Sequence, residues 1–90
     1  MSSRKVVKRK SKEMSLVIYH DDMNNEQLLS EIIRQALGYE YTQAINCAGV
    51  IMNKGSYTVK TFKVSEMPKA KATEQLFIEQ GIPAKLILKN

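Results

Sequence analysis

The sequence contains few of the side chains that build catalytic or metal sites. Its 90 residues include one cysteine, Cys47, and one histidine, His20. A lone cysteine excludes an internal disulfide and a multi-cysteine metal site. We interpret Cys47 as a small core residue, because a reactive thiol needs an activating partner and no histidine other than His20 exists. With no catalytic triad, metal-ligand cluster or phosphate-binding glycine loop, the sequence predicts neither an enzyme nor a bound cofactor or metal.

The chain also lacks long apolar runs. None approaches the roughly 18–20 residues of a membrane span, and the basic N-terminus has no apolar segment of the kind found in secretion signals. The content of 43% hydrophobic and 26% charged residues is normal for a soluble globular domain. We therefore expect one cytoplasmic domain that is monomeric and makes no contact with a membrane.

The net charge is concentrated at the N-terminus. Residues 1–13 carry six Lys/Arg and one acidic residue, Glu13, whereas residues 14–90 carry eight basic and eight acidic residues. The first segment is too poor in apolar side chains to offset the entropy of ordering it, so we expect residues 1–13 to be a disordered basic tail and residues 14–90 to be the folded domain. Such a tail can bind nucleic acid or act as a solubilising leader. A neutral domain argues against nucleic-acid binding as the main function.

Hydrophobic periodicity and turn residues predict the order β-α-α-β-α-β. Gly38, Gly55 and Gly81 each follow a segment with apolar residues at helical spacing. The predicted strands are Met14–His20, Tyr57–Phe62 and Ala84–Lys89, and the predicted helices are Asn25–Leu37, Tyr41–Asn53 and Pro68–Gln80. This order predicts an α+β fold in which three helices pack on a small, mainly antiparallel three-stranded sheet.

A pair of carboxylates, Asp21 and Asp22, follows the first predicted strand and precedes a predicted helix. Acidic groups at this place interact favourably with the positive end of the helix dipole. They can also receive a cationic group, such as the free amino terminus of a peptide. The residues alone leave both interpretations open. His20 beside them can likewise be a capping or surface residue instead of part of a binding site.

Residues 14–90 resemble the ClpS family, adaptors that deliver substrates with N-terminal degradation signals (N-degrons) to the AAA+ unfoldases of the Clp protease system. The resemblance rests on the joint spacing of landmarks rather than on one motif. These are Asp21-Asp22 at the strand end, Ala44 within the second helix, Gly55 after it, Glu66 and Lys71 five residues apart, and Pro83 before the last strand. The resemblance implies a ClpS-like fold, in agreement with the order of elements above.

In this family, an Asn and an Asp of the turn and a His of the second helix bind the α-ammonium of the substrate, beside an apolar pocket for its first side chain. The resemblance implies that Asp21 is the ammonium partner here. It implies a peptide-binding site formed by His20, Asp21, Asp22, Asn24, Glu26, Leu29, Ala48, Ile51 and Met52. It also implies that Glu66 and Lys71 contact the N-terminal domain of the unfoldase.

The chain departs from the family pattern within this site. His20 stands at the position of the family's Asn, and Met52 stands at the position of its helix His. A neutral imidazole can still accept a hydrogen bond, whereas a thioether is a weak acceptor. Glu26 replaces a Met at the pocket mouth and Asn24 replaces a Thr. A cationic first residue, or a different peptide, suits Glu26 better than an apolar first residue.

The predicted function is therefore that of an adaptor or regulator of a Clp-type AAA+ protease that docks on the unfoldase. Two versions stay open: the chain presents N-degron substrates with altered specificity, or it has kept docking and lost substrate binding. The expected partners are the N-terminal domain of the unfoldase and the amino termini of substrate peptides. The alternative is a small nucleic-acid- or ribosome-associated protein that acts through its basic tail, on a domain that shares only the fold.

Overall fold

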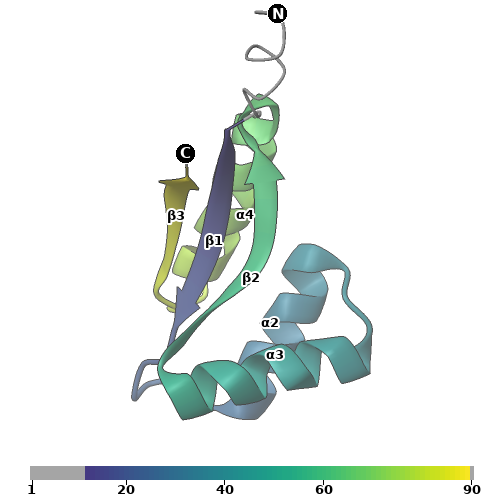
Figure 1. The fold of residues 1–90 in the computed structure, drawn as a ribbon. Coiled ribbons are helices and arrows are strands. Elements are labelled where there is room, and N and C mark those ends of the chain that lie inside the picture. The colour runs from purple at the N-terminus through teal and green to yellow at the C-terminus, as the bar shows by residue number, and fades with distance from the viewer. Residues whose placement is uncertain (1–11, 90) are drawn as a thin grey trace, which may run out of the picture.

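The computed structural model describes residues 12–89 and confirms the predicted α+β fold, with the order β-α-α-β-α-β (Figure 1). Its elements are β1 (Glu13–Tyr19), α2 (Glu26–Leu37), α3 (Tyr41–Lys54), β2 (Ser56–Lys63), the short 3-10 helix η1 (Val64–Glu66), α4 (Met67–Glu79) and β3 (Ala84–Lys89). The predicted strands and helices agree with these bounds to within one residue, and η1 was not predicted. The predicted tail comprises residues 1–13. The structure describes only residues 12 and 13 of it, and residues 1–11 lie outside the described part of the chain.

The three strands form an antiparallel sheet in the order β2-β1-β3. Figure 1 shows α4 lying along the sheet, while α2 and α3 form a helical hairpin beside one end of β2. Leu16 and Ile18 of the central strand are fully buried, because their face of the sheet is covered by the helices. The core joins the helix-facing side of the sheet to the inner faces of the helices, through Met14, Leu16, Ile18, Leu29, Ile32, Ile33, Ala44, Cys47, Ala48, Ile51, Val59, Phe62, Ala70, Phe77 and Ile82.

The ends of α2 and α3 are set by local chemistry. The side chain of Asn25 accepts a hydrogen bond from the backbone nitrogen of Leu28 at 2.8 Å and caps the start of α2. Gly38 and Gly55 follow α2 and α3 with φ values of 73° and 91°, a left-handed conformation that is strained for other residues. These stops fold α3 back along α2 and direct the chain from α3 into β2.

A β-bulge in β2 creates an unusual contact with the α2–α3 connection. Leu16 pairs with Lys60 and Val17 pairs with Thr58, so Val59 is the extra residue that the β1 ladder does not use. The hydroxyl of Tyr39 donates a hydrogen bond to the carbonyl oxygen of Val59 at 2.6 Å. The bulged carbonyl therefore obtains its partner from a residue 20 positions away in the sequence.

Tyr39→Phe is expected to destabilise the protein. It is also expected to make the free energy of unfolding fall less steeply as the pH rises in the alkaline range. Removal of the bond to Val59 should lower the free energy of unfolding by about 0.5–1.5 kcal/mol. Burial, with contributions from Cys47 and Tyr57, raises the pKa of Tyr39 above its ordinary 10.0. The folded state thus retains a proton that the unfolded state loses, so stability is full below pH 10 and falls as the pH rises through the raised pKa.

The measurement is urea unfolding at several pH values between neutral pH and the alkaline range. Burial also raises the pKa of the Cys47 thiol above 9.0, so a Cys47→Ala variant is the control that isolates the contribution of Tyr39. Equal alkaline destabilisation of the wild type and Tyr39→Phe, each in the Cys47→Ala background, would contradict the role given to the hydroxyl.

A side chain of α4 also contacts the backbone of β3. The Oε2 atom of Glu74 accepts a hydrogen bond from the backbone nitrogen of Leu86 at 3.2 Å. Because β3 has a strand neighbour on one side only, this carboxylate supplies an acceptor that no second strand provides. The bond fastens α4 to the outer strand of the sheet.

Candidate functional site

The segment that links β1 to α2 is a hydrogen-bonded turn held against two distant parts of the chain. The backbone nitrogen of Asn24 donates to the carbonyl oxygen of Asp21 at 3.0 Å, and that of Met23 donates to Oδ1 of Asp21 at 3.0 Å. The backbone nitrogen of His20 donates to the carbonyl oxygen of Gly55 at 2.8 Å, directly after α3. The turn is thereby fixed beside the last turn of α3, the part of that helix to which Met52 belongs.

The side chains of this turn differ widely in exposure. Asp22 and Met23 are exposed, with Met23 83% exposed, while His20 and Asp21 are half-buried. Asn24 is 8% exposed, and neither its Oδ1 nor its Nδ2 atom has a hydrogen-bond partner. Nδ1 of His20 is likewise buried without a partner. The resemblance placed Asn24 in the site, but nothing in the sequence indicated that its amide would be buried and unpaired.

The predicted apolar residues lie where α2 and α3 pack together. Leu29, Ala48 and Ile51 have 0% exposure and belong to the core, and the half-buried Met52 packs against it. A peptide side chain would therefore have to displace neighbouring atoms before it could touch Leu29, Ala48 or Ile51. The structure gathers these residues at one end of the helical hairpin and encloses three of them.

Glu26 lies at the rim of this region, in the first turn of α2. Its side chain is exposed, and Oε2 is 3.7 Å from the position that a Cβ atom on Gly49 of α3 would occupy. Gly49 precedes Val50 in α3 and directly follows the buried Ala48. The Glu26 carboxylate therefore lies against α3 at Gly49, a contact that sequence reasoning missed.

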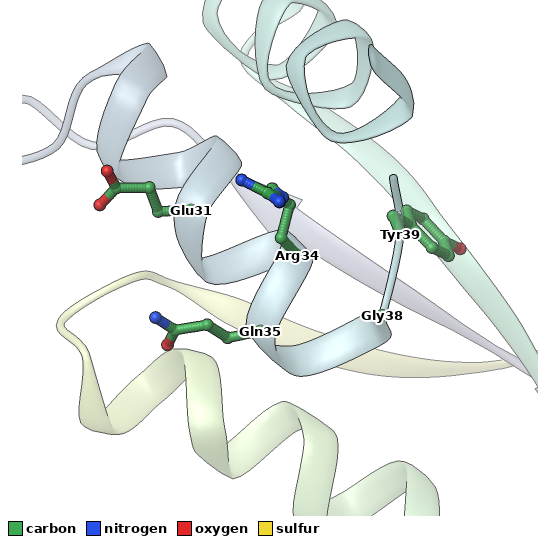
Figure 2. Close-up of a pocket in the computed structure, with 5 residues that line it drawn as sticks. All are labelled: Glu31, Arg34, Gln35, Gly38 and Tyr39. Atoms are coloured by element: carbon green, nitrogen blue, oxygen red, sulfur yellow. The ribbon is translucent and has the colours of Figure 1, made fainter. Parts of the chain in front are cut away.

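Surface hollows lie mainly on other parts of the molecule. Figure 2 shows one of about 380 Å³ at the end of α2, where Glu31 and Gln35 leave the helix on one side and Tyr39 lies beyond Gly38 on the other. A second, of about 330 Å³, runs between α2 and α3 and includes Glu26. Among the predicted peptide-site residues, Glu26 alone lines any of the hollows described for residues 12–89.

The two predicted docking residues have different environments. Glu66 ends η1, is half-buried, and accepts a hydrogen bond from the backbone nitrogen of Lys63 at 2.9 Å through Oε1. Lys71 is exposed on α4 and borders a hollow of about 250 Å³. That hollow lies between α4 and the strands β1 and β3, and its other lining residues are Met14, Met67, Glu74, Leu86 and Leu88. Glu66 therefore has a hydrogen bond within the domain, while the side chain of Lys71 is exposed to solvent.

The remaining predictions concern the core and the absence of other sites. Cys47 is buried in the core, which confirms its interpretation as a packing residue, and burial raises the pKa of its thiol. Met52 and Met67 also pack against the core. Within residues 12–89, no group of three or more His, Cys, Asp or Glu side chains is arranged to hold a metal ion. None of the helices in that range is both long and apolar enough to cross a membrane.

Comparisons with known proteins gave a match at the level of structure. The sequence matches no model of a known protein family and no curated protein sequence. The structure matches that of Agrobacterium tumefaciens ClpS2 bound to L-phenylalaninamide, with a TM-score of 0.67 and 17% sequence identity. The match covers 89% of this chain and 98% of the ClpS2 chain. This protein therefore has a ClpS-like fold.

Proposed function

We propose that this protein is an adaptor of a Clp-type AAA+ protease, which docks on the N-terminal domain of the unfoldase and presents substrates by their free amino termini. One observation carries the proposal: in a ClpS-like fold, a half-buried carboxylate, Asp21, lies in a turn with the buried acceptors of His20 and Asn24. An ammonium that is partly removed from water needs a carboxylate and fixed hydrogen-bond acceptors. The compound bound to ClpS2, L-phenylalaninamide, itself offers a free α-ammonium.

The same proposal includes a preference for cationic first residues. Glu26 places a carboxylate at the rim of the site. The hollow that it borders also contains the carboxylate of Glu31 and the guanidinium of Arg34, so the expected preference depends on Glu26 itself. Leu29, Ala48 and Ile51 have no exposed surface, so within the described residues they form no open cavity for a large apolar side chain. We therefore expect Arg or Lys at the first position to bind more tightly than Leu or Phe.

The experiment that tests the proposal is fluorescence anisotropy with short labelled peptides that differ only in the first residue, each made with a free and an acetylated amino terminus. Acetylation removes the positive charge, so the expected result is binding of the free peptides alone. Equal binding of both forms, or of neither, would show that the turn is no receptor for amino termini.

Docking on the unfoldase N-terminal domain is expected to depend on Lys71. Because Lys71 is exposed beside an apolar hollow, Lys71→Ala should weaken the complex by about 0.2–1 kcal/mol, which is up to about fivefold in Kd. Glu66→Gln tests the second residue, since glutamine keeps an oxygen that can accept from the Lys63 backbone but removes the charge. Isothermal titration calorimetry with the isolated unfoldase domain measures both variants.

Lys69 provides the matched control for this interface. It is exposed, lies on α4 two residues before Lys71, and does not line the hollow. Lys69→Ala should leave the Kd unchanged. If Lys69→Ala and Lys71→Ala weaken the complex equally, the loss of a positive charge anywhere on α4 explains the effect. Docking through the hollow beside Lys71 would then be contradicted.

A further inference from the structure

One face of the sheet is turned away from the helices. In β1, Met14, Leu16 and Ile18 are buried in the core on the helix-facing side, so the alternate residues of this strand lie on the opposite side. Directly paired residues of neighbouring strands lie on the same side of a sheet. The outer face is therefore formed by Glu13, Ser15, Val17 and Tyr19 of β1 and by the residues that pair with them in β2 and β3.

The charged residues of the outer face are mainly lysines. Lys63 and Lys89 pair with Glu13 from the two neighbouring strands, and Lys85 pairs with Val17. All three lysines are exposed. Adjacent strands are about 5 Å apart, so the backbones at Lys63 and Lys89 are about 10 Å apart, on either side of Glu13. The outer face therefore carries three positive charges and one negative charge.

The folded domain is neutral as a whole, but its two ends differ in charge. Residues 20–55, which include the turn after β1 and the α2–α3 hairpin, carry two basic and five acidic residues. Residues 56–89 carry six basic and three acidic residues, and residues 1–12 add six basic residues directly before Glu13. Figure 1 shows the start of β1 and the end of β3 at one end of the molecule and the hairpin at the other. Positive charge is thus concentrated at the end where the basic N-terminal segment joins the outer face.

The uncharged residues of the outer face suit the other parts of a nucleotide. Thr58 and Thr61 are exposed, and hydroxyl groups of this kind form hydrogen bonds with phosphate and sugar oxygens. Tyr19 is half-buried at the end of β1, where it lines a hollow of about 400 Å³ together with Lys85. Proteins that bind single strands combine aromatic rings, on which bases stack, with basic side chains that follow the phosphates.

We infer that the outer face binds single-stranded nucleic acid. Its lysines and the adjoining basic N-terminal segment contact the phosphates, and a base stacks on the ring of Tyr19 in the hollow beside Lys85. A single strand fits better than a duplex, because its unpaired bases are free to stack on a side chain. This second function does not depend on the proposed adaptor role, since the outer face includes neither the turn after β1 nor Lys71.

Other anionic partners fit the outer face less well. Binding to an anionic membrane uses a set of protruding apolar side chains, and Ile87 is the single large exposed apolar residue of this face. An acidic peptide would satisfy the lysines but has no base to place on Tyr19. Both partners are therefore competitors that the experiment has to exclude.

The first test compares two variants of the full chain that each lose two exposed lysines. The outer-face variant combines Lys85→Gln with Lys89→Gln, and the control variant combines Lys54→Gln with Lys69→Gln on α3 and α4. Fluorescence anisotropy with a labelled oligouridylate, at several salt concentrations, measures the Kd. Each phosphate contact of a single strand contributes about 0.7 to the slope of log K against log salt. The outer-face variant should lose about 1.4 from this slope and bind about tenfold more weakly, while the control variant should bind like the wild type.

The second test separates stacking from charge at Tyr19. Tyr19→Phe keeps the ring and should retain the affinity, whereas Tyr19→Leu keeps the apolar bulk without the ring. Tyr19→Leu should therefore weaken binding about fivefold or more. Because Tyr19 is half-buried, urea unfolding of both variants establishes that they are folded under the conditions of the binding assay. An oligothymidylate of equal length is measured in parallel, and the tighter ligand distinguishes RNA from DNA.

The outcomes decide between this inference and a general attraction of charges. Equal weakening by the two lysine pairs, or no binding by the wild type, would overturn the inference. Equal affinity of folded Tyr19→Leu and the wild type would also overturn it, because no base would then stack on the ring. Binding of polyglutamate or of phosphatidylserine vesicles as tight as that of the oligonucleotides would do the same. Selective loss of oligonucleotide affinity in the outer-face variant and in Tyr19→Leu supports the inference.

Discussion

Leu29→Ala is expected to lower the free energy of unfolding by about 2–5 kcal/mol, the range for a leucine truncated in a closed core. Leu29 has no exposed surface and packs where α2 meets α3 and the sheet. Domains of this size are stabilised by about 5–15 kcal/mol in total, so the variant should lose a large share of its stability. Urea unfolding of the purified protein, followed by circular dichroism, measures the change.

The neighbouring leucine is the matched control. Leu28 is half-buried at the edge of the core, so Leu28→Ala should cost clearly less than Leu29→Ala. If Leu29→Ala unfolds the protein completely, Leu29→Val gives a smaller truncation at the same position. Little loss of stability in Leu29→Ala would mean that Leu29 lines an open peptide pocket instead of the core.

Asp21→Asn is expected to weaken the binding of free-amino peptides by about 2 kcal/mol or more, about thirtyfold in Kd. Asparagine keeps an oxygen that can accept from the Met23 backbone, so the turn is preserved while the negative charge is lost. Without that charge, the α-ammonium is partly desolvated beside neutral acceptors only. Fluorescence anisotropy with the free and acetylated peptides measures the effect.

The second aspartate is the control for this variant. Asp22 is exposed, whereas Asp21 is half-buried, so Asp22→Asn should change the Kd by a factor of only about two or less, as expected for a screened surface charge. Acetylated peptides should bind the wild type as weakly as free peptides bind Asp21→Asn. A larger loss in Asp22→Asn than in Asp21→Asn would move the ammonium site to the outer carboxylate.

Most of the fold was predictable because local signals coincide with the ends of its elements. Asn25 caps α2, and Gly38 and Gly55 end α2 and α3 in left-handed conformations, as their positions in the sequence indicate. The strand order β2-β1-β3 and the bulge at Val59 were not predictable. Both depend on which strands meet in space, and the sequence pattern of a single strand does not encode its neighbours.

The candidate site was predictable only in part. Joint spacing placed Asp21, Asn24 and Glu26 around the start of α2, and these residues do lie there. The spacing of residues in the sequence does not show that Leu29 is fully buried in the core. It also does not show that the side-chain amide of Asn24 has no hydrogen-bond partner within the described residues. Exposure and hydrogen bonding are properties of packed side chains, and they depend on atoms from several elements at once.

The contact between Glu74 and the backbone of Leu86 has a consequence for how other chains can associate with this protein. An outermost strand normally offers free N–H groups, on which a foreign strand can add and extend the sheet or begin an aggregate. At Leu86, the carboxylate already occupies that group and places a negative charge along the edge. Addition of a foreign strand is therefore disfavoured at this point of the β3 edge.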